Sequence, residues 1–333
     1  MVFIQHACHT KVTTVSQTSD AFWITAPCRG EIRDSRLGDG DLTVETRFSG
    51  VSRGTELLVF RALVPAESRD IMACPFQEGR FPYPVKYGYA AVGQVIDGPR
   101  RGETVFSLHP HQRRFRVPEA AALPVPTAVP AERAILAANM ETALNGLWDA
   151  GAGPGDRVAV LGGGVVGQLV AYLSSRLPGA ETVLVDPDAD RRRIADGLGV
   201  RTSAAPPVDA PRPDIVVECT GAPQAVQQAI DWVGEEGVIV VISWLGQAPS
   251  DLMLGGRFHH GRLSLVSSQV GRLPPGRRGR WDHRRRLAKA LTLLGDPVLD
   301  SLITSEGPLP GLPSVMAAMA AGQTASLCHL VTY

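Results

Sequence analysis

The pattern of apolar and polar residues changes character near residue 130. Before this point, short runs alternate between the two. In residues 42–48, Leu42, Val44 and Phe48 fall on one side of a strand with polar side chains between them. Similar runs, separated by Gly, Pro and Asp, occupy residues 87–96, 104–108 and 113–117. This part of the chain predicts a small antiparallel barrel or sandwich.

After residue 130, strand-like and helix-like segments alternate. Continuous Val, Ile and Leu runs lie at residues 158–161, 182–185, 215–217, 238–242 and 263–266. Helical patterns lie at residues 131–150, 165–173, 191–198, 223–232, 284–294 and 312–321. Such an alternation predicts a parallel sheet covered by helices on both faces. The 333 residues are about twice a usual domain, so we expect an α/β protein with two domains.

Charge and composition exclude several classes of partner. Lys plus Arg and Asp plus Glu both number 33, and the pI is about 7.1, which argues against nucleic acid or an anionic membrane as a partner. Neither a secretory signal at the start nor an 18-residue apolar window is present. Scattered cysteines without a C-x-x-C pair fit reduced thiols and a cytoplasmic location; they are Cys8, Cys28, Cys74, Cys219 and Cys328.

The strongest motif is the glycine-rich stretch at residues 162–167. It follows a predicted strand directly and opens a predicted helix, as a dinucleotide-binding turn does. Gly162 permits the tight turn, Gly164 lets the backbone approach a pyrophosphate, and Gly167 lets the helix pack close to the strand. The diphosphate would then lie at a helix N-terminus, where unpaired N–H groups favour negative charge.

An acidic residue, Asp186, ends the next strand, 19 residues after Gly167. A carboxylate there accepts hydrogen bonds from ribose hydroxyls and repels a 2′-phosphate, so NAD is favoured over NADP. NADP stays possible because Arg191, Arg192 and Arg193 follow closely and could hold a phosphate; alternatively they cover a solvated helix face.

Four segments together resemble the medium-chain dehydrogenase/reductase superfamily. They are S-G-V-S-R-G-T-E at residues 49–56, K-Y-G-Y-A-A-V-G at 86–93, the glycine-rich segment at 155–167, and V-E-C-T-G at 217–221. The first is most similar to the branch that contains bacteriochlorophyllide hydroxyethyl dehydrogenases. The resemblance implies a GroES-like β-barrel catalytic domain at 1–138, completed by 269–333, and a Rossmann domain at 139–268. It also implies a homodimer.

The departures from that family concern zinc. Zinc-dependent members carry Cys where this chain has Ser52, and His-Glu where it has Tyr89 and Ala90; their third ligand falls near Ala138 or Asn139. Catalytic zinc needs three N, S or carboxylate ligands. We therefore expect no metal. A replacement site from Cys74, His109 and His111 would need a ligand from a distant loop and is disfavoured.

Without zinc, hydrogen-bond donors must stabilise charge on the substrate oxygen. The resemblance places Ser52, Thr55, Glu56 and Tyr89 around the former metal position. Tyr89 or Ser52 would donate to the oxygen, and Glu56 would accept or relay the proton. Asn139 and Glu141 are expected to face the same cavity. Each residue also has a structural interpretation, such as an ion pair of Glu56 or a buried tyrosine satisfying its hydroxyl.

The resemblance also implies the cofactor contacts. Arg53 is expected to reach the pyrophosphate, because a guanidinium binds phosphate oxygens bidentately. Trp244 either walls the substrate pocket or packs as an ordinary core residue. The other expected cofactor contacts lie in the glycine turn or at the ends of strands and helices, and comprise Thr142, Val165, Val166, Thr220, Ser243, Trp244 and Gln269.

Two further segments carry open alternatives. Residues 277–286 hold six arginines, which form either a solvated loop or a lip that attracts an anionic substrate. The aromatic, Pro-rich residues 61–84 form either a lid or a packed loop.

Three functions compete at this stage. The first is an NAD(H)-dependent oxidoreductase acting on a small-molecule alcohol or carbonyl without catalytic zinc. The second is an NADPH-dependent reductase of an activated C=C or C=N bond, as in quinone or enoyl reductases. The third is a nucleotide-binding protein without turnover.

Overall fold

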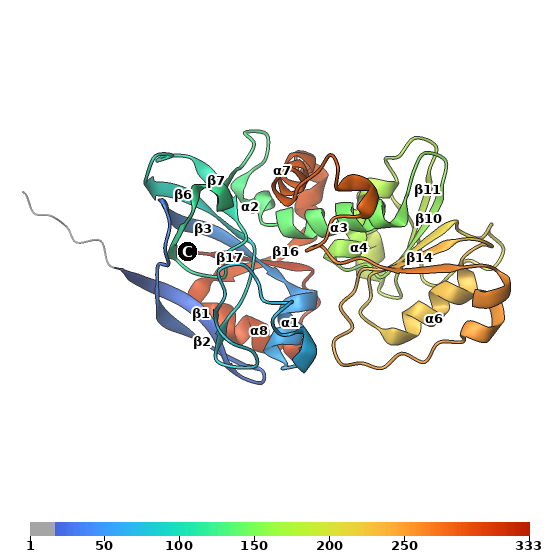
Figure 1. The fold of residues 1–333 in the computed structure, drawn as a ribbon, viewed down its shortest axis with the longest axis horizontal. Coiled ribbons are helices and arrows are strands. Elements are labelled where there is room, and N and C mark those ends of the chain that lie inside the picture. The colour runs from blue at the N-terminus through green and yellow to red at the C-terminus, as the bar shows by residue number, and fades with distance from the viewer. Residues whose placement is uncertain (1–16) are drawn as a thin grey trace, which may run out of the picture.

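The computed structural model describes residues 17–333. Residues 1–16 lie outside the described residues. They include Cys8 and the N-terminal segment in which we expect no secretory signal. A barrel-like domain and a Rossmann domain flank helices α3 (Ala137–Ala150) and α4 (Val165–Ser174) in Figure 1. Within residues 17–333, no helix is both long and apolar enough to traverse a bilayer.

The barrel-like domain contains two sheets. The smaller has the order β2 (Arg29–Arg36), β1 (Thr18–Ala26), β5 (Val85–Lys86), β4 (Glu78–Gly79). The larger has the order β16 (Ile303–Pro308), β17 (Cys328–Thr332), β3 (Leu42–Ser52), β6 (Ala91–Asp97), β7 (Thr104–Ser107), β9 (Leu123–Pro124), and β8 (Arg114–Val117) also pairs with β3. The return segment therefore completes the sheet that the N-terminal part begins.

The Rossmann domain is one parallel sheet of six strands. Its order is β12 (Arg201–Ser203), β11 (Glu181–Val185), β10 (Arg157–Leu161), β13 (Ile215–Glu218), β14 (Val238–Val241), β15 (Ser264–Ser267). The strand order reverses between β10 and β13, which is where open α/β sheets bind ligands. Both faces of β10 are buried, because Val158 and Val160 join one apolar cluster while Ala159 and Leu161 join another.

The remaining helices cover these sheets. They are α1 (Arg53–Phe60), α2 (Ala131–Ala134), α5 (Ala189–Gly197), α6 (Pro223–Trp232), α7 (His283–Leu293) and α8 (Leu312–Ala320). Short helical turns occur at Ala66–Ser68, Glu119–Ala121, Leu254–Phe258, Pro275–Arg277, Pro297–Leu302 and Leu309–Gly311.

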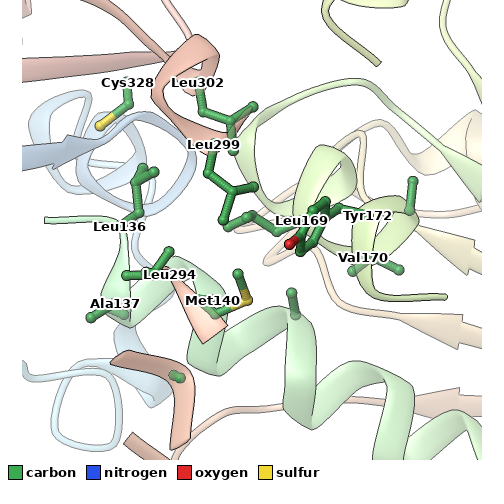
Figure 2. Close-up of a cluster of buried hydrophobic side chains, with 14 of the residues drawn as sticks. Leu136, Ala137, Met140, Leu169, Val170, Tyr172, Leu294, Leu299, Leu302 and Cys328 are labelled. Carbon is green, nitrogen blue, oxygen red and sulfur yellow. The ribbon is translucent and has the colours of Figure 1, made fainter. Parts of the chain in front are cut away.

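A single apolar cluster joins the two domains. It combines side chains from α3, α4, the segment after α7, and β17. Burial of each large side chain contributes about 1.5–3 kcal/mol to stability. Because these side chains come from both domains, the same burial holds one domain against the other. Figure 2 labels ten of its members: Leu136, Ala137, Met140, Leu169, Val170, Tyr172, Leu294, Leu299, Leu302 and Cys328.

Several sequence predictions of local structure need correction. The helix predicted over residues 131–150 is two helices, interrupted at Ile135 and Leu136, whose side chains are fully buried between the domains. The strand predicted over 87–96 begins only at Ala91, because Gly88 has φ +139° and breaks the extended run. The β1–β2 hairpin was missed. The predicted boundary between residues 138 and 139 falls in the first turn of α3, and the domain limits stay a prediction.

Candidate active site

A cavity of about 830 Å³ is lined by residues of both domains, and we call it the interdomain cavity. One side consists of the glycine turn and the carboxyl ends of β10, β11, β13 and β14. The other side consists of the β3–α1 junction, Tyr89 and the first turns of α3. The predicted switch point of the sheet and the predicted catalytic segment therefore open into the same space.

The glycine turn has the geometry that its sequence predicts. Gly162 has φ +101°, and a Cβ there would lie 2.9 Å from the carbonyl carbon of Cys219. A Cβ on Gly167 would lie 1.8 Å from the carbonyl oxygen of Gly162, so only glycine lets α4 approach β10. A Cβ on Gly164 would meet nothing within 4 Å, which leaves open space at the N-terminus of α4 for an anion.

Asp186 lies at the cavity, as predicted, but its carboxylate already has partners. Oδ2 accepts from the backbone N–H of Gly163 at 2.6 Å, and Oδ1 accepts from that of Asp188 at 2.8 Å. Nη1 of Arg191 donates to Oδ2 at 3.3 Å. Hydrogen bonds from the backbone and Arg191 thus orient the negative charge at the end of β11, and ribose hydroxyls can bind only to its remaining lone pairs.

Three arginines line the cavity near the glycine turn: Arg53, Arg61 and Arg191. Burial lowers the pKa of Arg53, and the like charges of Arg191 and Arg61 lower it further. Nη1 of Arg53 donates to the carbonyl of Ser326 at 3.2 Å, so this side chain is anchored to the return segment. A concentration of guanidinium groups beside a helix N-terminus suits a diphosphate.

Most of the other predicted cofactor contacts line the cavity. They are Gly162, Gly164, Thr142, Val165, Val166, Thr220, Ser243 and Trp244. Gly167 lies behind this surface and acts through packing. Gln269 is not among the residues that line this cavity: its side chain lies against Gly271 and donates to Sδ of Met72 at 3.8 Å, and its cofactor contact stays a prediction.

A group of polar side chains lines the opposite side of the cavity. We call Ser52, Thr55, Tyr89 and Asn139 the hydroxyl cluster, although Asn139 contributes an amide. Nδ2 of Asn139 donates to Oγ of Ser52 at 3.2 Å, and Tyr89 lines the cavity with them. Burial, and secondly the charge of Glu56, raise the pKa of Tyr89 far above its ordinary value, so its hydroxyl keeps its proton.

Glu56 lies directly behind the hydroxyl cluster rather than on the cavity surface. It is only 2% exposed. Oε1 accepts from the backbone N–H of Ser52 at 2.7 Å, and Oε2 lies 2.9 Å from Nε2 of His111. The anticipated ion pair with the neighbouring Arg53 is thus replaced by a buried carboxylate–imidazole contact.

The prediction that Glu141 faces the cavity is wrong. Its side chain is buried on another face of α3, where Oε1 accepts from Nε of Arg286 at 3.0 Å. Desolvation raises the pKa of Glu141, while Arg286 acts in the opposite direction. The helical period explains the error, since Asn139 and Glu141 are two residues apart and point in different directions.

The structure also places the two segments for which alternatives were open, residues 61–84 and 277–286. None of the six arginines in residues 277–286 lines the interdomain cavity: Arg286 is buried beside Glu141, and Arg277 and Arg285 stack on Trp148 and Trp281. Residues 61–84 pack as a loop, with Val64 and Cys74 in an apolar cluster and only Arg61 at the cavity.

Among the side chains that line the cavity, Asp186 and Cys219 are the ones of a type that binds zinc. Within residues 17–333, no three His, Cys, Asp or Glu side chains gather as metal ligands, and the hydroxyl cluster has no thiolate, imidazole or carboxylate. Cys74, His109 and His111 are not such a group either. Burial raises the pKa of Cys74 to about 12, so its thiol keeps its proton, and the His109 ring stacks on Phe115 with centroids 3.9 Å apart.

Some cavity residues were missed by the sequence analysis. Gly221 belongs to the V-E-C-T-G segment and follows β13 as the glycine turn follows β10, so this repeated position was an available signal. Leu327 comes from the return segment and has no local signal. The full set of missed lining residues is Gly54, Leu57, Leu58, Arg61, Leu161, Val185, Pro187, Ala204, Ala205, Pro206, Cys219, Gly221, Ala222, Ala225, Gln228, Ile242 and Leu327.

Sequence comparison finds relatives among dehydrogenases, although no protein-family model matches the chain. D-guloside 3-dehydrogenase of Escherichia coli K12 is 23% identical over 296 residues, covering 77% of this chain and 81% of the relative. A 2-desacetyl-2-hydroxyethyl bacteriochlorophyllide A dehydrogenase of Cereibacter sphaeroides is 28% identical, covering 68% and 74%. A 2-dehydro-3-deoxy-L-galactonate 5-dehydrogenase of Pseudoalteromonas atlantica is 34% identical, but the match covers only 35% of this chain and 36% of that relative.

Solved structures share the whole fold. L-idonate 5-dehydrogenase of Escherichia coli superposes with a TM-score of 0.77 at 16% identity, covering 95% of this chain and 98% of that one. An alcohol dehydrogenase of Escherichia coli CFT073, solved with NADH, gives 0.76 at 15% identity, covering 96% and 100%. A structure from Sinorhizobium meliloti 1021, described as a zinc-binding dehydrogenase bound to NADP, gives 0.76 at 20% identity, with 96% and 100% covered. The chain thus shares the fold of these dehydrogenases over nearly its whole length, and its sequence is similar to those of the dehydrogenases named above.

Proposed function

We propose that the protein transfers hydride between NAD(H) and a secondary alcohol or its ketone, in a hydroxyl-rich small molecule, without a metal ion. The observation that carries the proposal is the hydroxyl cluster, which stands opposite the glycine turn in one cavity. The family resemblance implies that these donors lie where zinc-dependent members hold their metal, and they include no good zinc ligand.

The residues present fit a dinucleotide. The N-terminus of α4 and Arg53 would hold its diphosphate, and Asp186 would meet the ribose. A bound nicotinamide supplies the hydride acceptor or donor. NAD is favoured over NADP because the carboxylate of Asp186 opposes a 2′-phosphate, although Arg191 beside it would partly offset that repulsion.

The hydroxyl cluster would polarise the substrate oxygen. Negative charge develops on the substrate oxygen when hydride is added to a ketone, and fixed donors stabilise that charge. Tyr89 is suited to this role because its hydroxyl keeps its proton. Asn139 donates to Ser52, so these two side chains are held in position before substrate arrives.

The polar character of the cavity also indicates the substrate class. Four hydrogen-bonding side chains stand near the partly buried Trp244. Such a mixture suits a polyhydroxylated molecule, whose hydroxyls need partners and whose C–H faces pack on an aromatic ring. Two of the relatives are named for sugar-derived substrates, D-guloside and 2-dehydro-3-deoxy-L-galactonate.

Three measurements on the purified protein test the proposal. Tryptophan fluorescence titrations with NADH and NADPH compare the two affinities, and we expect NADH to bind more tightly. Absorbance at 340 nm monitors oxidation of methyl D-guloside, L-idonate, galactitol and 2,3-butanediol with NAD⁺. Metal analysis and chelator treatment test for zinc.

The outcomes separate the candidates. Stoichiometric zinc, with activity lost on chelation, would contradict the metal-free mechanism. Tighter NADPH binding, with reduction of quinones or enones only, would favour the C=C reductase. Binding of NADH without turnover on any substrate would favour the non-catalytic alternative. The homodimer and the cytoplasmic location stay predictions; light scattering on the purified protein tests the first.

A further inference from the structure

Four side chains form a continuous hydrogen-bonded chain behind the hydroxyl cluster. Oε2 of Glu56 lies 2.9 Å from Nε2 of His111. Nδ1 of His111 lies 2.7 Å from Oγ of Ser49, and this hydroxyl lies 2.7 Å from the hydroxyl of Tyr333. Both ring nitrogens of His111 are therefore engaged, one toward the active site and one away from it.

The two ends of this chain lie at different surfaces. At the inner end, Glu56 accepts from the backbone of Ser52, whose side chain lines the interdomain cavity. At the outer end, Tyr333 lines a separate groove of about 490 Å³ that Arg113 and Glu45 also border. Ser49, His111 and Glu56 are at most 2% exposed, so the chain crosses the domain interior.

The fold fixes this arrangement from three separate segments. Ser49 pairs with Val331 in the β3–β17 ladder, so Tyr333, two residues further, falls on the same face of the sheet. Glu56 comes from α1, and His111 from the loop before β8. A buried carboxylate–imidazole pair usually costs more desolvation than it returns, and a use in proton transfer would account for its presence.

We propose that Glu56, His111, Ser49 and Tyr333 form a proton relay between the active site and the groove beside Tyr333. The inference rests on the proposed function, because alcohol oxidation releases one proton per turnover into a cavity that cofactor and substrate would fill. The relay gives that proton a route that does not pass through the cavity mouth.

In total, the relay moves one proton from the substrate to the solvent. Bound NAD⁺ would accept the hydride with both electrons of the substrate C–H bond, and the relay assigns the substrate O–H proton to Glu56, which accepts from the backbone N–H of Ser52 beside the hydroxyl cluster. With His111 as its Nδ1–H tautomer, protonated Glu56 gives its proton to Nε2 of His111, while Nδ1 gives its own proton to Ser49. Ser49 passes its own proton to Tyr333, which releases one to water in the groove. Ketone reduction runs the same steps in reverse.

The test measures proton conduction directly, without relying on turnover. In protein labelled with ¹⁵N-histidine, NMR gives the rate at which the imidazole N–H of His111 exchanges with solvent, and the variant His111→Gln assigns the signal. We expect Tyr333→Phe to slow this exchange about tenfold or more, since it removes the outer hydroxyl that passes protons. Tyr172→Phe is the matched control, because the hydroxyl of Tyr172, on α4, donates to Asp296 and takes no part in this chain. Unchanged exchange in Tyr333→Phe overturns the relay.

Turnover then tests whether the relay serves catalysis. With the best substrate among the four polyols and sugar derivatives above, Tyr333→Phe should lower kcat about tenfold, leave KM unchanged and enlarge the solvent deuterium isotope effect. If Tyr333→Phe fails to fold, Ser49→Ala interrupts the same chain one position further in. Slow exchange with unchanged kcat contradicts the catalytic use. If exchange is slow in Tyr333→Phe but the wild-type protein oxidises none of the four substrates, the proposed function is contradicted and the proton path is still supported.

Discussion

The two sides of the interdomain cavity are built in different ways. On the cofactor side, backbone atoms of one short turn and the N-terminus of α4 form the surface, and residues 162–167 are contiguous in sequence. On the substrate side, single side chains converge from the β3–α1 junction, the loop before β6 and α3. A site formed by the backbone of one turn is determined by a few neighbouring residues. A site formed by side chains from separate segments depends on how those segments pack together. Perturbations should therefore have different effects on the two sides.

The largest effect is expected in the glycine turn, from Gly167→Ala. The added Cβ would lie 1.8 Å from a backbone oxygen that cannot move without displacing β10. We expect a loss of about 4 kcal/mol in the free energy of unfolding, with NADH binding abolished. Urea denaturation and fluorescence titration measure the two quantities.

Gly164→Ala is the matched variant in the same turn. Its Cβ would meet nothing within 4 Å, so stability should change by no more than about 0.5 kcal/mol. Cofactor affinity should still fall, because the methyl group occupies the space through which a diphosphate approaches. Equal destabilisation by both substitutions would contradict the separate roles assigned to the two glycines.

On the substrate side, Tyr89→Phe should affect chemistry and leave the cofactor untouched. Loss of one fixed donor to a developing oxyanion lowers kcat by about 10² to 10³, equivalent to about 3–4 kcal/mol. The affinity for NADH and the midpoint of unfolding should stay near their wild-type values. A kcat within threefold of wild type would show that Tyr89 does not polarise the substrate.

The same contrast explains what the sequence could predict. The roles of Gly162, Gly164 and Gly167 follow from steric limits on a few neighbouring residues, and the structure has them as expected. The parallel strands were found because long Val and Ile runs fit only a sheet buried on both faces. The β1–β2 hairpin was missed because β2 is mostly polar and half exposed, which weakens its alternation.

The substrate side was predicted from the family resemblance, and it was right where the backbone fixes direction. Ser52 and Tyr89 reach the cavity, while Glu141 turns away to Arg286. The partner of Glu141 lies 145 residues further along the chain, and that of Glu56, at His111, lies 55 residues away. Neither pairing can be recognised from the neighbouring sequence, so only the folded structure shows the two pairs.

Glu141→Gln tests the corrected role of that residue. The amide keeps the shape but loses the charge-assisted hydrogen bond with Arg286, which should lower the free energy of unfolding by about 2–3 kcal/mol. Because Glu141 does not line the cavity, kcat and KM should stay within twofold of wild type. A selective loss of kcat without loss of stability would restore Glu141 to the catalytic group.

The smallest effect expected is an acid sensitivity that belongs to the barrel-like domain. His109 is 3% exposed, and burial lowers its pKa to about 3 from an ordinary value of 6.5. Between these values the unfolded chain binds a proton that the folded protein does not, so stability falls as the pH drops below about 6.5. From pH 7 to 5.5 this amounts to about 1 kcal/mol at 1.36 kcal/mol per pH unit.

His109→Phe isolates that contribution from the other groups that titrate in the same range. Phenylalanine keeps the ring between Phe76 and Phe115, whose centroids lie 5.5 and 3.9 Å from that of His109, but it cannot be protonated. Urea denaturation of both proteins at pH 7 and pH 5.5 gives the difference between their losses. The variant should lose about 1 kcal/mol less than wild type. Parallel losses would mean that His109 is protonated in the folded protein, and the acid sensitivity would then have to arise elsewhere in the chain.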